Sequence, residues 1–337
     1  MKRFRMMKTS LFVLSTSMAF LLFPLLGSEI VLAQYPTEPI MFMVPSGSGS
    51  GLDVTARTVA AVIQQEKIIP QLLQVFNREG GSGTVGLTEL VNQHRKNPYM
   101  IMVTSPIITF NELNGVSRLG YRDVVPIAQL ITDYVILAVR EDSRFKTLKD
   151  LVEALKQNPA SVSLAGGGVP GSANHLPLLY ILDAAGVPNV TSLPYAAFMG
   201  DGKALIALLG GHADVASVTL GASISYLEAK KLRSLAVTYP KRLDGPITKD
   251  LATAKEQGAD VVFPMWRGVV GPPGIPDYAV KYLQEAFGKM VKTKAWKEAL
   301  EQRQWIDSFK TTEFKAFLDN EFGSNKARLD KLGYFKK

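Results

Sequence analysis

Two loops rich in glycine and serine contain the residue types best suited to hold an anion. The first loop follows a short apolar run and consists of Ser46, Gly47, Ser48, Gly49, Ser50 and Gly51. The second loop runs from Gly166 to Ala173, before a helix expected from about Asn174. The first N–H groups of a helix have no acceptor within it, and the helix dipole leaves partial positive charge there. Each loop is therefore predicted to bind a carboxylate or phosphate, and the two loops together are predicted to close around one small acid from opposite sides.

Further candidate ligand contacts lie within or beside these loops. Ser172 and Asn174 lie at the start of the second helix, where each could contact the ligand or serve as the N-cap. His175 could donate a hydrogen bond to the ligand or could be a structural pin that only holds the loop in place. Asp53 is expected to cap the first helix and to position its loop. The remaining candidates are Gly167, Thr104, Ser105, Asp214 and Ser217, of which Asp214 is either a contact or a residue that orients one. Trp266 is either core packing or a ligand platform, and Arg267 either forms a salt bridge or meets a carboxylate.

Alternating strands and helices must position these side chains. Apolar runs at Ile40–Val44, Leu72–Phe76 and Met100–Thr104 predict buried strands, each followed by a helical pattern. This alternation is typical of a parallel sheet, in which ligands sit outside the carboxyl ends of the strands. Later strands are predicted at Tyr134–Val139, Val162–Ala165 and Leu232–Thr238, and helices at Tyr278–Lys292, Ala295–Gln302 and Thr312–Leu332.

The first 33 residues have the features of a secretory signal peptide. A basic start is followed by an apolar core from Leu11 to Leu26 and by small or apolar residues before a cleavage site after Ala33. The alternative, an uncleaved membrane anchor, is disfavoured because Pro24 and Gly27 interrupt a run that is short for a bilayer of about 30 Å. The chain has no cysteine, so disulfides are excluded. We therefore expect a free periplasmic protein.

Charge and length narrow the class of protein further. The leader carries four basic residues and one acidic residue, so its removal lowers the formal net charge from +8 to +5. The basic residues are scattered without interleaved aromatic residues, which gives no support to nucleic-acid binding. About 300 mature residues exceed what one hydrophobic core usually serves, so two domains are expected.

The order of motifs resembles the substrate-binding proteins of tripartite tricarboxylate transporters, also called Bug receptors. The motifs that carry the resemblance are Tyr35 to Ile40, Pro45 to Asp53, Asn77 and Arg78 with Gly80 to Gly83, Thr147 to Leu151, Gly171 to His175, Leu208 to Val215, Leu232 to Thr238, and Trp266 to Gly268. Each motif is weak alone, but their order and spacing cover essentially the whole mature chain. The resemblance implies an α/β protein with the type II periplasmic binding fold, in which two doubly wound α/β lobes are joined by two crossing strands around a ligand cleft.

By analogy with this family, lobe 1 spans 34–132 plus 262–337 and lobe 2 spans 133–261, with crossings near Tyr134–Val139 and Val261–Pro264. The resemblance also implies a monomer without cofactor or metal that delivers a small di- or tricarboxylate to membrane subunits of the transporter. In the family, the first strand–helix loop and the loops of the second lobe hold the carboxylates. An aromatic residue near the ligand corresponds to Tyr195 or Phe198, and the spacing favours Phe198. The first loop departs from the family by having more hydroxyls and less bulk, which predicts a larger or more polar acid.

Other functions have weaker support. Two segments, Gly81 to Gly86 and Gly166 to Gly171, match the dinucleotide pattern G-x-G-x-x-G, but neither has an evident acidic partner for a ribose. A secreted serine hydrolase would use Ser172, His175 and Asp214, although no G-x-S-x-G elbow precedes a helix. A ligand-sensing partner of a two-component sensor kinase is a third possibility that the residues do not separate from transport.

Overall fold

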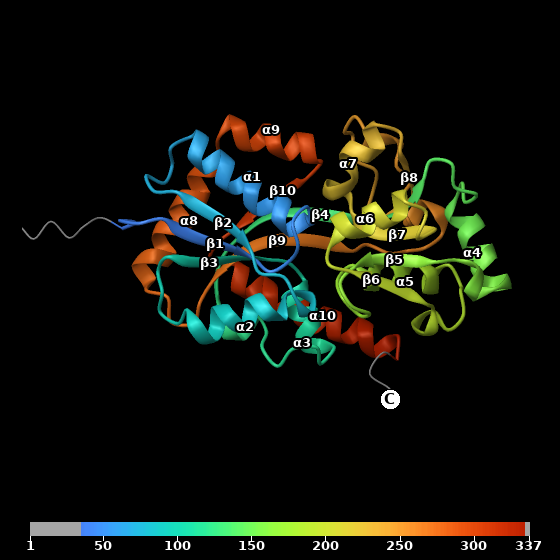
Figure 1. Ribbon diagram of the computed structural model, residues 1–337, viewed down its shortest axis with the longest axis horizontal. Coiled ribbons are helices and arrows are strands. Elements are labelled where there is room, and N and C mark those ends of the chain that lie inside the picture. The colour runs from blue at the N-terminus through green and yellow to red at the C-terminus, as the bar shows by residue number, and fades with distance from the viewer. Residues whose placement is uncertain (1–34, 334–337) are drawn as a thin grey trace, which may run out of the picture. The chain divides into compact units, whose positions relative to one another are not determined.

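A mixed sheet of ten strands organises residues 35–333, the part of the chain described by this computed structural model (Figure 1). The predicted signal peptide, 1–33, lies outside these residues. The strands are β1 (Ile40–Val44), β2 (Leu73–Asn77), β3 (Met100–Thr104), β4 (Val125–Arg140), β5 (Leu164–Gly167), β6 (Tyr195–Phe198), β7 (Val215–Thr219), β8 (Leu232–Val237), β9 (Pro264–Gly271) and β10 (Ile306–Lys310). Their main order is β2-β1-β3-β9-β4-β7-β5-β6, and both β8 and β10 pair with β4.

The long strand β4 belongs to two lobes. Residues up to Tyr134 pair antiparallel with β9, whereas residues from Val135 onward pair antiparallel with β7 and β8. We call β1, β2, β3, β9, β10 and the first part of β4 the first lobe, and the second part of β4 with β5 to β8 the second lobe. β1 pairs parallel with β2 and β3, and β5 pairs parallel with β6 and β7, as the alternation of strands and helices predicts. The predicted fold of two α/β lobes joined by crossing strands is confirmed.

Helices cover both faces of each lobe (Figure 1). They are α1 (Gly51–Gln65), α2 (Thr84–Gln93), α3 (Ile107–Leu113), α4 (Leu148–Gln157), α5 (His175–Ala184), α6 (Asp201–Leu209), α7 (Leu220–Glu228), α8 (Asp277–Met290), α9 (Lys294–Arg303) and α10 (Phe314–Lys331). The first lobe packs α1, α8 and α9 on one face and α2, α3 and α10 on the other. The second lobe packs α6 and α7 on one face and α4 and α5 on the other. No helix among residues 35–333 is both long enough and apolar enough to cross a membrane.

The structure differs from the sequence prediction at β4 and β10. β4 begins nine residues before the predicted Tyr134, because its first part contains polar residues such as Gln129 and Asp133 that are buried inside the protein. β10 lacks a continuous apolar run and pairs only with β4. The lobe boundaries, 34–132 plus 262–337 and 133–261, remain predictions, since the described residues 35–333 group into one compact unit.

The buried carboxyl group of Glu321 on α10 forms hydrogen bonds to β9, one of the two crossing strands, and to α3. One oxygen accepts a hydrogen bond from Trp266 Nε1 at 2.7 Å, and the other lies 3.0 Å from the hydroxyl of Thr109 on α3. The same hydroxyl lies 2.8 Å from the carbonyl oxygen of Pro106, and it has only one hydrogen to donate. A protonated Glu321 resolves this conflict by donating to Thr109. Burial agrees with this assignment, since it raises the pKa of Glu321 to about 7.

We expect Glu321→Gln to be stabilising above neutral pH. The folded state binds the Glu321 proton more tightly than the unfolded state does, so this contribution to stability is lost as pH rises from about 4.5 past 7. Glutamine is neutral at every pH and can keep both hydrogen bonds. The free energy of unfolding of the variant, relative to wild type, is expected to rise by about 1–2 kcal/mol between pH 5 and pH 8. Urea unfolding at both pH values measures this difference, and Glu285→Gln on the exposed face of α8 is the control. Parallel pH profiles for Glu321→Gln and wild type would contradict the assignment.

Candidate functional site

Both predicted loops open onto one cavity of about 260 Å³ between the lobes. This volume is slightly below the range of about 300–1,000 Å³ that is usual for small-molecule sites, which indicates a small ligand. Four short segments form most of its wall: the start of α1, the loop before α2, the loop before α5 and the loop before α6. The lining residues from these segments are Pro45, Ser46, Gly47, Ser50, Gly51, Leu52, Gly80, Gly81, Ser82, Gly83, Gly167, Gly168, Val169, Ser172, Ala173, Asn174, Ala197, Phe198, Met199, Gly200 and Asp201, with Ser105, Ile107, Met265 and Arg267 completing the wall.

The start of α1 presents unpaired N–H groups to this cavity. Ser50 is the N-cap, and its hydroxyl accepts a hydrogen bond from the N–H of Asp53 at 3.2 Å. The Asp53 carboxylate accepts from the N–H of Gly49 at 2.9 Å, which fixes the loop as predicted for a positioning residue. The N–H groups of Gly51 and Leu52 have no acceptor among residues 35–333. They are therefore free to bind a ligand oxygen at the positive end of the helix.

The loop before α5 is held in place by its own side chains. The N–H of Gly171 donates to His175 Nδ1 at 2.9 Å, and the Ser172 hydroxyl donates to the carbonyl oxygen of Gly167 at 3.3 Å. Burial lowers the pKa of His175 to about 4, so its ring is neutral near pH 7. His175 does not line the cavity, and its ring packs against the ring of Tyr195 with 4.2 Å between the ring centroids. The structure thus favours the structural-pin interpretation of His175.

The lobes touch at the rim of the cavity. The N–H of Val169 donates to the Ser82 hydroxyl at 2.9 Å, and the Asn114 side-chain amide donates to the carbonyl oxygen of Gly171. Lys203 also lies 3.5 Å from the Glu79 carboxylate. These contacts join loops of the first lobe to loops of the second, so the structure has the lobes closed on the cavity.

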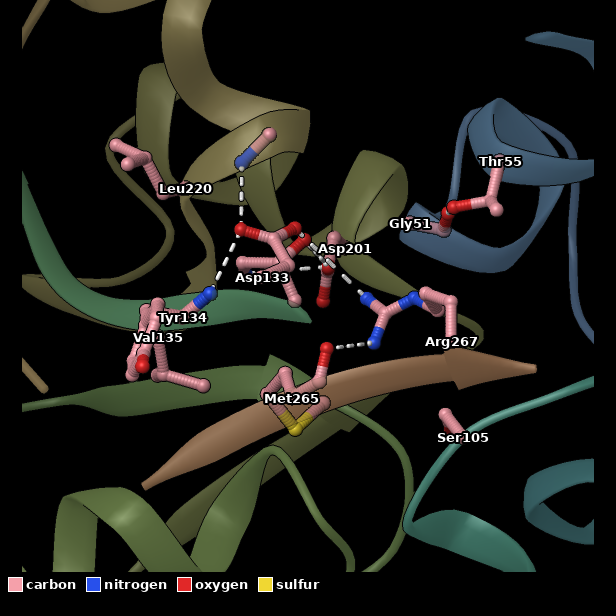
Figure 2. Close-up of polar contacts among 12 residues, drawn as sticks. Gly51, Thr55, Ser105, Asp133, Tyr134, Val135, Asp201, Leu220, Met265 and Arg267 are labelled. Atoms are coloured by element: carbon pink, nitrogen blue, oxygen red, sulfur yellow. Dashed lines mark hydrogen bonds and ion pairs between the residues drawn. The ribbon is translucent and has the colours of Figure 1, made fainter. Parts of the chain in front are cut away.

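A buried charge cluster lies beside the crossing strands β4 and β9 (Figure 2), and two of its members, Arg267 and Asp201, line the cavity. Arg267 on β9 is 2 % exposed, and its Nη2 lies 4.0 Å from the carboxylate of Asp133 on β4. Arg267 Nη1 donates to the carbonyl oxygens of Met265 at 3.1 Å and Trp266 at 3.3 Å. Its Nε has no hydrogen-bond partner among the described residues.

The second carboxylate of the cluster is Asp201, at the start of α6. One oxygen of this carboxylate accepts a hydrogen bond from the side-chain amide of Asn174 at 2.5 Å. The other oxygen accepts two hydrogen bonds from Thr219, one from its hydroxyl at 2.6 Å and one from its backbone N–H at 3.2 Å. Burial raises the pKa of Asp201 and raises that of Asp133 to about 6, while the nearby Arg267 favours the ionised form of both. One guanidinium therefore lies beside two buried carboxyl groups, and its charge favours the ionised form of each.

The family described as "Tripartite tricarboxylate transporter family receptor" matches residues 55–333 of this sequence. The chain belongs to this receptor family. The family consists of substrate-binding receptors and not of enzymes. A UPF0065 protein of Pseudomonas sp. strain P51 is 28% identical over 273 residues, which cover 80% of this chain and 78% of that protein.

Solved structures of similar proteins share the fold of the receptor. A TctC solute-binding protein from Polaromonas, solved without ligand, is 28% identical with a TM-score of 0.61, covering 88% of this chain and 99% of that one. An R. palustris protein solved with adipate is 24% identical with a TM-score of 0.77, covering 89% of this chain and 97% of that one. The likeness to this second protein shows the fold alone.

Eight predicted site residues of the receptor line the cavity: Ser46, Gly47, Ser50, Ser105, Gly167, Ser172, Asn174 and Phe198. Among the described residues, seven other candidates do not line it: Ser48, Gly49, Asp53, Thr104, His175, Asp214 and Ser217. Ser48 and Gly49 are exposed on the outer side of their loop. Ser217 donates to the carbonyl oxygen of Asn174 at 2.6 Å, so it supports a cavity residue without reaching the cavity itself.

Asp214 lies at the wrong end of its strand for a ligand contact. It precedes β7, whereas the cavity lies beyond the carboxyl ends of the parallel strands, and its carboxylate accepts from the N–H and hydroxyl of Ser163 at 2.8 and 2.7 Å. Ser172, His175 and Asp214 are therefore not joined as a catalytic triad in the described part of the receptor. The same residues, 35–333, contain no group of three or more His, Cys, Asp or Glu side chains arranged to hold a metal ion.

The sequence analysis missed Asp201 and left the role of Arg267 open. Asp201 follows the predicted aromatic Phe198 by three residues and opens a helix, so it has the sequence features of an ordinary acidic residue in a first turn. Ser82 was seen only as part of a glycine-rich motif. A signal for Asp201 and Arg267 did exist: each is a charged residue next to a strongly apolar segment, which is unusual unless the charge has a buried partner.

Proposed function

We propose that this protein is a periplasmic receptor that binds a small organic acid between its two lobes and delivers it to the membrane subunits of a tripartite tricarboxylate transporter. The observation that carries the proposal is the one cavity that both predicted anion-binding loops line. We further propose that the receptor acts as a monomer and is exported with cleavage after Ala33. The predicted lobe boundaries, 34–132 plus 262–337 and 133–261, are part of the same proposal.

The proposed mode of binding uses neutral donors at one end of the cavity. A carboxylate near the start of α1 accepts from the N–H groups of Gly51 and Leu52 and from serine hydroxyls of the same wall. Buried carboxylates need several hydrogen bonds, because an unpaired one loses several kcal/mol of hydration free energy. The loops of the second lobe then complete the wall when the lobes close by a hinge motion.

Thermal unfolding of the mature protein with a panel of organic acids tests this proposal. A ligand that binds only the folded state raises the melting temperature. At a concentration of one hundred times Kd, it adds about 2.7 kcal/mol to the free energy of unfolding. Adipate belongs in the panel, because the similar R. palustris protein was solved with it. The absence of a shift with every acid, confirmed by calorimetric titration, would contradict a carboxylate receptor.

Gly51→Ala is expected to weaken acid binding several-fold without unfolding the protein. A Cβ at this position would lie 2.5 Å from Arg267 Nη2 and 3.0 Å from Thr219 Oγ1, so the guanidinium must shift away from the start of α1. Calorimetric titration with the best acid of the panel measures the change in Kd. Gly323→Ala on α10 is the matched control, because it also changes a helical glycine and its Cβ meets nothing within 4 Å. An unchanged Kd in Gly51→Ala would separate the start of α1 from the ligand.

A further inference from the structure

The charges on the cavity wall bear on the charge of the ligand. Among residues 35–333, Arg267 and Asp201 are the only formally charged side chains that line the cavity. Behind the wall, the Asp133 carboxylate lies 4.0 Å from the Arg267 guanidinium. Asp133, Asp201 and Arg267 are each 2 % exposed, so solvent screens their interaction little. The single cation of the wall thus already has two buried carboxyl groups beside it before any ligand arrives.

One N–H of Arg267 nevertheless lacks a hydrogen-bond acceptor among the described residues. Its Nη1 is occupied by two backbone carbonyl oxygens, whereas Nε has no acceptor in the described part of the chain. A buried guanidinium N–H without an acceptor costs about 1–3 kcal/mol, which a ligand oxygen would restore. Nη2 of the same side chain faces Gly51, where the free N–H groups of α1 begin. Arg267 and α1 therefore form one anion site, and not two separate ones.

Apart from Arg267, the cavity wall has no cationic side chain among residues 35–333 that could balance a second negative charge. Its larger side chains are apolar, namely Leu52, Ile107, Val169, Phe198, Met199 and Met265. The Asp201 carboxylate would repel a second ligand carboxylate placed near it. Removing that carboxylate from water without a cation would cost several kcal/mol.

We infer that the ligand is a monocarboxylate with an uncharged body, whose carboxylate lies between the first turn of α1 and the guanidinium of Arg267. This inference rests on the proposed function and narrows it, since the family resemblance by itself implies a di- or tricarboxylate. The apolar residues of the wall contact the body of the ligand, and Asp201 excludes acids of higher charge.

Acids paired with their own monoamides provide the test, because the two members of a pair have nearly the same size and shape. The pairs are succinate and succinamate, adipate and its monoamide, and terephthalate and its monoamide, titrated calorimetrically into the mature protein at pH 7.5. For the scaffold that binds best, we expect the monoamide to bind at least about tenfold more tightly than the diacid. Equal or tighter binding of the diacid would overturn the inference while leaving a carboxylate receptor in place. Binding of no acid, in these pairs or in the wider panel, would overturn the proposed function and the inference together.

Asp201→Asn tests the origin of the selectivity. Removing this charge is expected to shift the ratio of the two affinities at least about tenfold toward the diacid. Asp214→Asn is the control, since Asp214 is an acid of the same lobe that does not line the cavity. An unchanged ratio in Asp201→Asn would overturn the role of Asp201. If this variant does not fold, the comparison of diacid with monoamide in the wild-type protein still decides the charge of the ligand.

Discussion

Replacing Arg267 by methionine is expected to lower the free energy of unfolding by about 3–5 kcal/mol, because it leaves buried carboxylates without their cation. Asp133 and Asp201 are each 2 % exposed, so water cannot take the place of the guanidinium. Urea unfolding at pH 7.5 measures the loss. Arg242→Met is the control: it removes a half-exposed arginine that pairs with Glu256 on the surface, and it should cost about 1 kcal/mol or less.

The loss in Arg267→Met should depend on pH and on Asp133. Burial already raises the pKa of Asp133 to about 6 with the arginine present, and removal of the arginine raises it further. Asp133 will therefore be protonated in the folded variant below about pH 6, and the difference from wild type should shrink between pH 7.5 and pH 5. The double variant Arg267→Met with Asp133→Asn should recover part of the loss at pH 7.5. A loss that is independent of pH and unaffected by Asp133→Asn would indicate a packing defect instead of unpaired charge.

Gly200→Ala is expected to weaken ligand binding at least about 30-fold, or about 2 kcal/mol, by keeping the lobes apart. Gly200 precedes α6 with φ 101° and ψ 168°, a conformation that is essentially restricted to glycine. A Cβ there would also lie 2.9 Å from Cβ of Ser50 in the opposite lobe. Since neither atom belongs to a flexible chain end, the lobes must separate to relieve the clash.

Gly115→Ala is the control that separates the effect of lobe closure on affinity from the effect of backbone strain. Gly115 also has a positive φ, 70°, but a Cβ there meets nothing within 4 Å. Calorimetric titration gives the affinities, and small-angle X-ray scattering at saturating ligand gives the radius of gyration. We expect Gly200→Ala to remain more extended than wild type and Gly115→Ala to match it. Comparable affinity losses in both variants would attribute the effect to strain and not to the contact between lobes.

The sequence predicted the local elements well because they depend on neighbouring residues. β1 and β3 coincide with their predicted apolar runs. The expected cap of α1, Asp53, lies in the first turn instead, and the N-cap is Ser50. Each loop follows the carboxyl end of a parallel strand in its own lobe, where such sheets bind ligands, a rule that needs no knowledge of the side chains. The crossing strands β4 and β9 then place the two loops opposite each other. The eight candidates that line the cavity follow from this rule.

The charge cluster could not be predicted in the same way. Asp133, Asp201 and Arg267 are far apart in the sequence and lie on β4, α6 and β9, and only the tertiary fold brings them together. The same is true of Ser82 and Val169, whose contact depends on how far the lobes close. Asp214 was a candidate because it is next to a strand, but the wrong end of that strand was assigned to the cavity.

The contacts between the lobes also bear on how long a captured molecule stays. Ser82 with Val169, Asn114 with Gly171, and Glu79 with Lys203 all join loops that form the rim, so escape requires these contacts to break. The residence time of the ligand then depends more on the rate at which the rim contacts open than on the contacts between the ligand and the cavity wall. The Glu79–Lys203 pair is about half exposed, so added salt weakens this contact while leaving the buried Arg267 site largely unscreened. Uptake and release can thus respond to ionic strength independently of selectivity.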